Sequence, residues 1–124
     1  KIDFLLKALV VILIILFNNT NTVYGANINW IEVSKTPAGV QYLDRDNINI
    51  KGKGIIELTT KYLKIDPSTA KKVEENIYVM NINCLTNKFK DVSVNGKKKL
   101  TAKWEDPKGD KLLIDVISDG CENV

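Results

Sequence analysis

Residues Asn76–Cys84, with the sequence NIYVMNINC, decide how the rest of the chain is arranged. The run has the length of a β-strand, is rich in β-branched and aromatic side chains, and is bounded by turn-forming residues. Apolar groups occur on both of its faces, whereas a strand buried on one face alone would alternate more cleanly. Because side chains repeat every two residues, Cys84 shares a face with Met80 and Ile82. The pattern predicts a central strand that a cysteine closes.

The only two cysteines of the sequence, Cys84 and Cys121, allow a single intramolecular pairing. In an exported chain an even cysteine count favours a disulfide, and a redox pair would be expected close together, as in Cys-x-x-Cys. In a reducing cytosol the same residues would be two unrelated small apolar side chains. Closing a loop of this length removes roughly 4 kcal/mol of unfolded-chain entropy. We therefore expect a structural disulfide between Cys84 and Cys121.

The beginning of the sequence sets the expected compartment. Lys1 and Lys7 flank the start of an apolar run, Ala8–Phe17, and small residues precede Ala26. This pattern predicts a secretory signal peptide over residues 1–25. The run is shorter than the roughly 20 residues that a bilayer core needs, and an uncleaved membrane anchor is the alternative. The signal peptide predicts an exported protein, periplasmic or extracellular. Because no cysteine stands directly after the run, we expect no lipid anchor.

Residues 26–124 have the size of one domain, since 124 − 25 leaves 99 residues. Their net charge is +2, which is the full-chain +3 less the +1 of Lys1 and Lys7 against Asp3. A nucleic-acid-binding protein would carry a concentrated basic face, so this mild charge argues against nucleic acid as the partner. We predict a single β-rich domain.

Short runs of β-branched and aromatic residues, separated by turn signals, predict the strands before the central one. Their expected ranges are 28–34, 40–44 and 55–63, and Ile48–Ile50 leads into a tight turn at Lys51–Gly54. The polar segment Lys64–Glu75 predicts a mobile loop, and one helical turn capped by Ser68 is the alternative.

After the central strand, Asn95-Gly96 predicts a tight hairpin between Phe89–Val94 and Lys98–Trp104. Alternation along the second of these strands predicts a buried face. That face would carry Leu100, Ala102 and Trp104.

The end of the chain changes its period, because Leu112, Leu113, Val116 and Ile117 recur at helical spacing. Asp110 is suited to cap the start of this helix and Gly120 to end it. The competing interpretation is a last strand, Lys111–Ile117. The expected fold is α+β, a mainly antiparallel sheet of about six strands with a C-terminal helix that one disulfide fastens.

The order of these landmarks resembles the surface-adhesin protein E-like family of small exported bacterial proteins. The resemblance implies an antiparallel sheet with a C-terminal helix, one disulfide and a homodimer built by sheet contact. It also implies adhesion, by binding host matrix and plasma proteins. Ala26 stands where the lipidated adhesin has its anchoring cysteine. The landmarks are Trp30, Val40–Asp44 with Asn47-Ile48, Ile55–Leu63, Cys84, Trp104 before Asp106-Pro107, and Cys121.

Histidine is absent from the sequence, which removes the commonest general base at neutral pH and most zinc sites. Asp44 and Asp46 are the nearest to a carboxylate pair, but the further oxygen ligands and the loop glycine of a calcium site are missing. We interpret them as solvated carboxylates at a strand end. We expect no enzyme, no metal and no cofactor.

Lys97, Lys98 and Lys99 form the densest basic cluster and are the candidate partner-binding residues. A basic hairpin could hold acidic polysaccharide, lipid headgroups or an acidic protein face. Lysines on an edge hairpin also prevent pairing with another sheet, and the absence of arginine here favours that structural role. Trp30 and Trp104 are interpreted as core residues.

The sequence thus favours a small exported, non-catalytic binding protein of the periplasm or cell envelope, adhesin-like by resemblance. Its expected partner is a protein or polysaccharide of the envelope, with neither nucleic acid nor a small-molecule cofactor. The alternative is a periplasmic inhibitor of a cell-wall hydrolase. Such hydrolases are often basic, so the net charge of +2 speaks against that alternative.

Overall fold

The computed structural model describes residues 28–122 and 124, so the predicted signal peptide lies outside the described residues. These residues form one antiparallel sheet and a C-terminal α-helix, which confirms the predicted fold class. The strands are β1 (Trp30–Thr36), β2 (Gly39–Asp44), β3 (Asn49–Gly52), β4 (Ile55–Ile65), β5 (Lys72–Asn83), β6 (Lys88–Val94) and β7 (Lys97–Lys98). A 3-10 turn, η1 (Arg45–Asn47), follows β2, and the helix is α2 (Lys111–Cys121).

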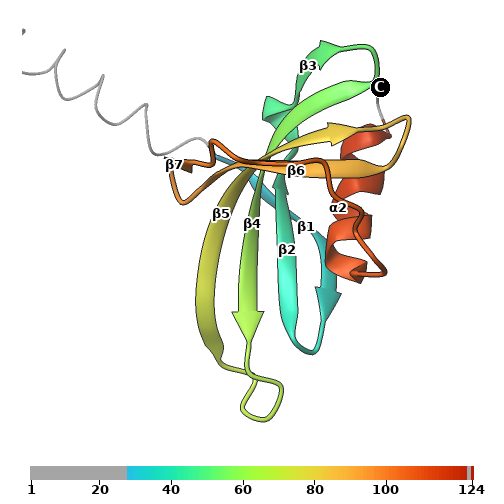
Figure 1. Ribbon diagram of the computed structural model, residues 1–124. Coiled ribbons are helices and arrows are strands. Elements are labelled where there is room, and N and C mark those ends of the chain that lie inside the picture. Colours follow the sequence, from blue (N-terminus) through green and yellow to red (C-terminus); the bar gives the residue numbers. More distant parts are fainter. Residues whose placement is uncertain (1–27, 123) are drawn as a thin grey trace, which may run out of the picture.

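The sheet has the order β1-β2-β4-β5-β6-β7, and β3 pairs with one end of β4 (Figure 1). β5 therefore lies inside the sheet, as the sequence of residues 76–84 predicted. β2 and β3 both pair with the same edge of β4, at different positions along it. Gly39 of β2 pairs with Lys64, whereas Asn49 of β3 pairs with Glu57. The turn η1 connects them at the point where the chain passes from one end of β4 to the other.

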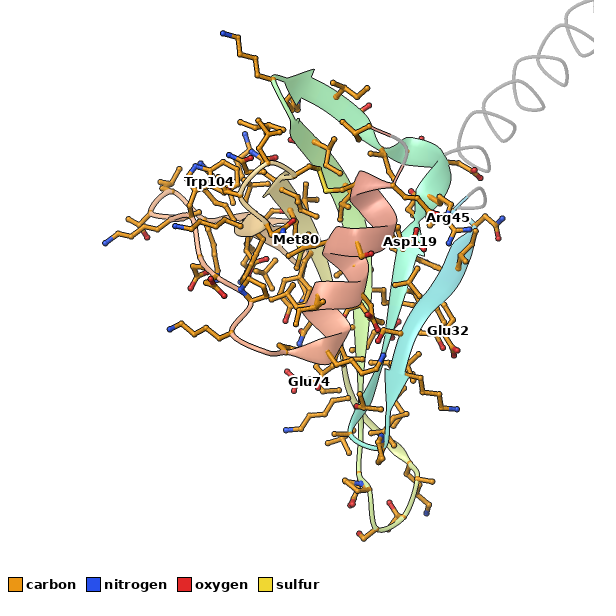
Figure 2. The ribbon with its side chains drawn as sticks, turned by 90° about the vertical axis from the view of Figure 1, so that its right-hand side faces the viewer. Glu32, Arg45, Glu74, Met80, Trp104 and Asp119 are labelled. Carbon is orange, nitrogen blue, oxygen red and sulfur yellow. A yellow bond between two sulfur atoms is a disulfide. The ribbon has the colours of Figure 1, made fainter. Side chains whose placement is uncertain are left out.

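The core lies between α2 and one face of the sheet, and Figure 2 shows the helix in front of Met80. The opposite face of β5 has no helix over it among the described residues, and Ile77 on that face is 38% exposed. Arg45 makes a bidentate ion pair with Asp119 beside the carboxyl end of α2, with N–O distances of 3.1 and 2.9 Å. The buried apolar residues of this core are Leu43, Ile56, Leu58, Met80, Ile82, Phe89, Val116 and Ile117.

The predicted disulfide is confirmed and joins Cys84, directly after β5, to Cys121, the last residue of α2. The two Cα atoms are 5.7 Å apart. Both cysteines are partly buried against the core, so the bond closes the layer between helix and sheet at one end.

The helix begins as predicted, because the Asp110 side chain accepts hydrogen bonds from the backbone N–H groups of Leu112 and Leu113. The alternative of a last strand is therefore wrong. The expected end at Gly120 is also wrong, since the helix continues to Cys121. Gly120 is buried, and a Cβ there would lie 2.6 Å from Leu58 Cδ2. The glycine is needed for close packing of the helix on β4 rather than for ending the helix.

The segment Lys64–Glu75 is a smaller loop than the sequence predicted. β4 continues to Ile65 and β5 begins at Lys72, which leaves residues 66–71 between the strands. The polar side chains continue the strands because they pair across them, and Glu75 has Lys61 and Lys72 within 3.7 and 2.8 Å. Ser68 does not cap a helical turn here, but donates its N–H and hydroxyl to Asp66 Oδ1.

The hairpin after β6 is partly as predicted. Asn95 and Gly96 both have positive φ angles, 51° and 81°, as a tight two-residue turn requires. The predicted strand Lys98–Trp104 is wrong, because β7 contains only Lys97 and Lys98.

A mismatch in register explains why the second strand of this hairpin stops early. Lys99 N donates to Val92 O at 2.9 Å, and the next pairing joins Glu105 to Phe89. Lys99 and Glu105 are 6 positions apart (105 − 99), whereas their partners are 3 apart (92 − 89), so three residues bulge outward. Leu100, which was predicted to be buried, is 93% exposed on this bulge.

Candidate binding site

The predicted basic cluster lies at the edge of the sheet and continues into the bulge. Lys97 and Lys98 form β7, the last strand in the sheet order, and Lys99 follows; all three are exposed. This edge position suits the role of preventing contact with another sheet. None of the three makes an ion pair with a described residue, so their charges remain open to a partner.

Two large apolar side chains lie on the same segment, which we call the contact loop (residues 97–104). Leu100 is 93% exposed and Trp104 is 39% exposed. The Lys90 ammonium lies 4.6 Å from the centre of the Trp104 ring, which fixes the ring against the outer side of β6. Figure 2 shows Trp104 at the edge of the sheet away from α2. The prediction that Trp104 belongs to the core is wrong.

Trp30 is not a core residue either, because it is only half-buried and has Lys61 as a neighbour. The Lys61 ammonium lies 5.1 Å from the Trp30 ring centre and 4.8 Å from that of Tyr42. These side chains are on the sheet face that the helix leaves uncovered, since Tyr42 and Lys61 are direct cross-strand partners there. The methylene chain of Lys61 and the two aromatic rings cover one another from water, on a face where no helix of the described residues packs.

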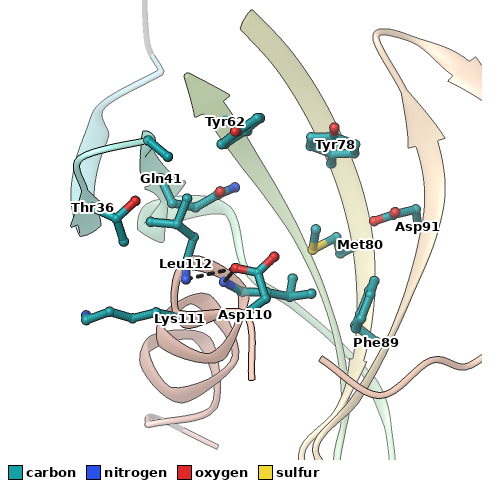
Figure 3. A pocket seen from close by; sticks show the side chains of 12 residues that line it. Thr36, Gln41, Tyr62, Tyr78, Met80, Phe89, Asp91, Asp110, Lys111 and Leu112 are labelled. Carbon is teal, nitrogen blue, oxygen red and sulfur yellow. Dashed lines mark hydrogen bonds between the residues drawn. The ribbon is translucent and has the colours of Figure 1, made fainter. Parts of the chain in front are cut away.

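A groove of about 470 Å³ lies beneath the amino end of α2 (Figure 3). The helix covers only part of the sheet face, and beyond its first turn the inward side chains of β4, β5 and β6 remain open. Asp91 on β6 faces the groove beside Met80, its cross-strand partner. The principal lining residues are Gln41, Tyr62, Tyr78, Met80, Phe89, Asp91, Asp110, Lys111, Leu112 and Leu113.

Burial governs the electrostatics of this groove. Burial raises the pKa of the Asp91 carboxyl above its usual range, nearby Lys99 acts to lower that pKa, and Glu105 acts to raise it. Burial also raises the pKa of the Tyr78 hydroxyl, and the charge of Asp91 adds to the effect. Asp91 Oδ1 has less than 1 Å² exposed and no hydrogen-bond partner among the described residues.

The sequence contains one signal for this groove, and it lies outside the recognisable motifs. Asp91 stands two residues after Phe89 on β6, so a strand that buries Phe89 turns Asp91 to the same face. A carboxylate on the inner face of a strand marks either a paired charge or a site.

Asp44 and Asp46 do not form a cation site. Asp44 is 4% exposed and accepts hydrogen bonds from Asn47 Nδ2 at 3.1 and 3.0 Å, so the prediction of a solvated carboxylate is wrong for Asp44. The 3-10 turn folds Asn47 back onto the end of β2, and Asp46 remains exposed. Over residues 28–122 and 124, no three His, Cys, Asp or Glu residues are grouped so that they could hold a metal ion. No helix of this part of the chain has the length and apolar content to cross a bilayer.

Comparison with known proteins gives one family. Residues 31–124 match the family model described as the surface adhesin-E family, which covers β2 to α2 and nearly all of β1. No curated protein and no solved structure matches the chain.

Proposed function

The chain belongs to the surface adhesin-E family, and from this premise we propose an exported, adhesin-like protein that acts by contact rather than by catalysis. We further propose that the contact loop is its binding surface and that the partner presents an acidic protein face. The observation that supports this proposal is the joint exposure of Leu100 and Trp104 beside three unpaired lysines.

Edge protection alone does not account for the composition of the contact loop. Lysines are sufficient to keep an edge strand from pairing, and apolar side chains on the same edge would work against it. Leu100 is almost fully exposed in the free protein, so covering it with a partner removes apolar surface from water. Trp104 offers a large side chain that Lys90 already holds in place, which lowers the entropy lost on binding.

The charges of the loop indicate the chemistry of the partner. Lysine presents a point charge, whereas arginine supplies the bidentate contacts that phosphate and sulfate favour, and the loop has no arginine. Glu105 and Asp106 follow Trp104 directly and offset the charge of Lys103, so the positive charge of the loop is concentrated at Lys97–Lys99. Carboxylates of a protein face match these lysines, with apolar residues beside them for Leu100 and Trp104.

An affinity screen of residues 26–124 against matrix proteins, envelope polysaccharide and the protein itself tests this function. Binding of the protein to itself tests the homodimer that the resemblance implies. The informative variant replaces Lys97, Lys98 and Lys99 by Gln. The control variant replaces Lys53, Lys64 and Lys71 by Gln, because these lysines are exposed, make no ion pair with a described residue and lie outside the loop.

We expect at least one protein ligand, with affinity that falls as salt is added. The loop variant should lose tenfold or more in affinity, and the control variant should stay within about twofold. Equal affinity of the two variants would refute the contact loop, and uniformly negative screens would remove support for an adhesin-like function. Binding to polysaccharide alone would refute the protein partner.

No feature of the structure favours the periplasmic inhibitor of a cell-wall hydrolase, which stays a prediction of the sequence. A lysis-protection assay tests it separately, and the absence of protection would dispose of it.

A further inference from the structure

The groove beneath α2 carries negative charge, although the whole chain has a net charge of +3. Asp91 and Asp110 contribute carboxylates to its lining, and Figure 3 shows them on opposite sides of Met80. Lys111 also lines the groove, but its ammonium donates to Asp115 Oδ2 on the helix. The lysine charge is therefore directed to Asp115 and leaves the two acidic side chains of the groove uncompensated.

Asp91 is the stronger of the two charges as a binding group. The Asp110 carboxylate already accepts two backbone hydrogen bonds through Oδ1 as the helix cap. Asp91 accepts none from the described residues, and its Oδ1 is buried without a partner. Lys99 and Glu105 act on Asp91 with opposite charges, and Lys99 makes no ion pair with it within 4.0 Å. A half-buried carboxylate with one enclosed and unpaired oxygen gains free energy from a cation that replaces lost water.

The walls of the groove suit an apolar stem that ends in a cation. Met80, Leu112 and Leu113 supply aliphatic surface, and Phe89 and Tyr78 supply aromatic surface. Aromatic faces attract cations, and this attraction strengthens where water is excluded. The volume of about 470 Å³ lies within the range of known ligand pockets.

We propose that this groove binds the side chain of a lysine from a partner protein, with Asp91 as the counter-ion of its ammonium group. The four methylenes of the lysine lie along Met80 and Leu113, and the ammonium lies between Asp91 and the ring of Tyr78. No residue of the contact loop lines this groove, although Asp91 also borders Lys99 and Lys103 of the loop on a neighbouring hollow. The site depends on the proposed function only in requiring that the partner be a protein.

Lysine fits this groove better than arginine or an anion. A guanidinium needs two carboxylate oxygens for its bidentate contact, whereas an ammonium needs one, and Asp91 has a single oxygen that is not enclosed. The amino end of a helix attracts anions, but here Asp110 already occupies the N–H groups of Leu112 and Leu113, and Asp91 repels a second negative charge. A point charge on an apolar stem remains as the matching chemistry.

The test is a titration of the ¹⁵N-labelled protein, residues 26–124, with Nα-acetyl-lysine methylamide, followed by two-dimensional NMR. The uncharged control ligand is Nα-acetyl-norleucine methylamide, and the competing cations are Nα-acetyl-arginine methylamide and tetramethylammonium. The test variant is Asp91→Asn. The control variant is Asp46→Asn, which removes the same charge from an exposed position far from the groove.

We expect saturable shifts at the amides of Tyr78, Asp91 and Leu112 with the lysine derivative, at a dissociation constant of about 1 mM. Asp91→Asn should weaken binding tenfold or more, Asp46→Asn should leave it unchanged, and norleucine should not bind. Binding should also weaken on acidification as Asp91 is protonated. A dispersed spectrum of the Asp91→Asn variant shows that it is folded, so a loss of binding is not a loss of structure.

Several results would overturn the proposal. These are the absence of saturable shifts, equal binding by the Asp91→Asn protein, and binding of arginine or tetramethylammonium as tight as that of lysine. The variant of Lys97–Lys99 separates the two proposals, because it should retain binding of the lysine derivative. If lysine fails to bind while partner binding still depends on the contact loop, only the groove proposal is lost.

Discussion

Asp91 lies on the inner face of β6, where burial disfavours its charged form. The pKa of the carboxyl is therefore raised, and the charge costs folding free energy. A carboxyl with a raised pKa binds protons more tightly in the folded state than in the unfolded state. The folded state therefore loses stability as pH rises through the window between the usual and the raised pKa. Below the usual aspartate pKa, both states are protonated and the penalty is absent.

We predict that Asp91→Asn raises the free energy of unfolding near pH 7, because it removes the disfavoured charge. The gain should not exceed about 1 kcal/mol, since the side chain is partly exposed and solvent screens the charge. The gain should vanish near pH 3. Urea unfolding of both proteins at the two pH values measures it, with Asp46→Asn as a control that changes neither value appreciably. A loss of stability at pH 7 would show that Asp91 is a structural acceptor.

Gly120 is the second residue whose role differs from its sequence signal. Alanine is up to about 1 kcal/mol more favourable than glycine in an exposed helix, but here its Cβ would lie 2.6 Å from Leu58 Cδ2 and 3.3 Å from Ile56 Cδ1. Leu58 is 1% exposed, so a shift of its side chain disturbs the packing of the core. We predict that Gly120→Ala lowers the free energy of unfolding by about 1–3 kcal/mol.

Ser118→Ala is the control for this substitution, because Ser118 is exposed on the same helix. Its effect should stay within about 0.5 kcal/mol. Thermal unfolding of the two variants decides the matter, and an unchanged or higher melting temperature for Gly120→Ala would show that helix and sheet are less closely packed.

Among the elements, the contact loop is the one that the sequence predicted as a buried strand and that the structure shows as an exposed bulge. Leu100 was expected to be part of a buried face, and the structure places it at 93% exposure. We predict that Leu100→Ala changes the free energy of unfolding by no more than about 0.5 kcal/mol. The matched substitution Leu58→Ala, in the core, should cost about 2–5 kcal/mol. Chemical denaturation measures both changes. A loss of about 2–5 kcal/mol for Leu100→Ala would show that Leu100 is buried in a strand, as the sequence predicted.

In the same element the turn could be predicted from the sequence, but the length of the strand after it could not. Asn95-Gly96 determines the turn because both residues need positive φ, and this local demand is visible in the sequence. The length of the following strand depends on register with β6, which three extra residues between Lys99 and Glu105 disrupt. Leu100, Ala102 and Trp104 alternate in the bulge as they would in a strand, so the pattern alone could not separate the two structures.

For the whole molecule, the features that could be predicted are those that a local composition, a period or a pairing marks. The length and apolar content of Asn76–Cys84 predicted the central strand, and the helical period near Val116 predicted the closing helix. The cysteine pair joined them. The groove could not be predicted in the same way, because it arises where a helix of limited length leaves part of the sheet uncovered. Its single local sign is the position of Asp91, two residues from Phe89.

The bond between Cys84 and Cys121 holds the helix on the sheet, and both proposed binding surfaces depend on this arrangement. The two residues are separated by 37 positions, and opening a loop of that size should remove about 4 kcal/mol of stabilisation. Urea unfolding followed by circular dichroism, with and without reductant, measures this most directly. We predict a loss of about 4 kcal/mol on reduction, and no effect of the reductant on a Cys84→Ser/Cys121→Ser protein. An identical unfolding curve for the oxidised and reduced protein would contradict the claim.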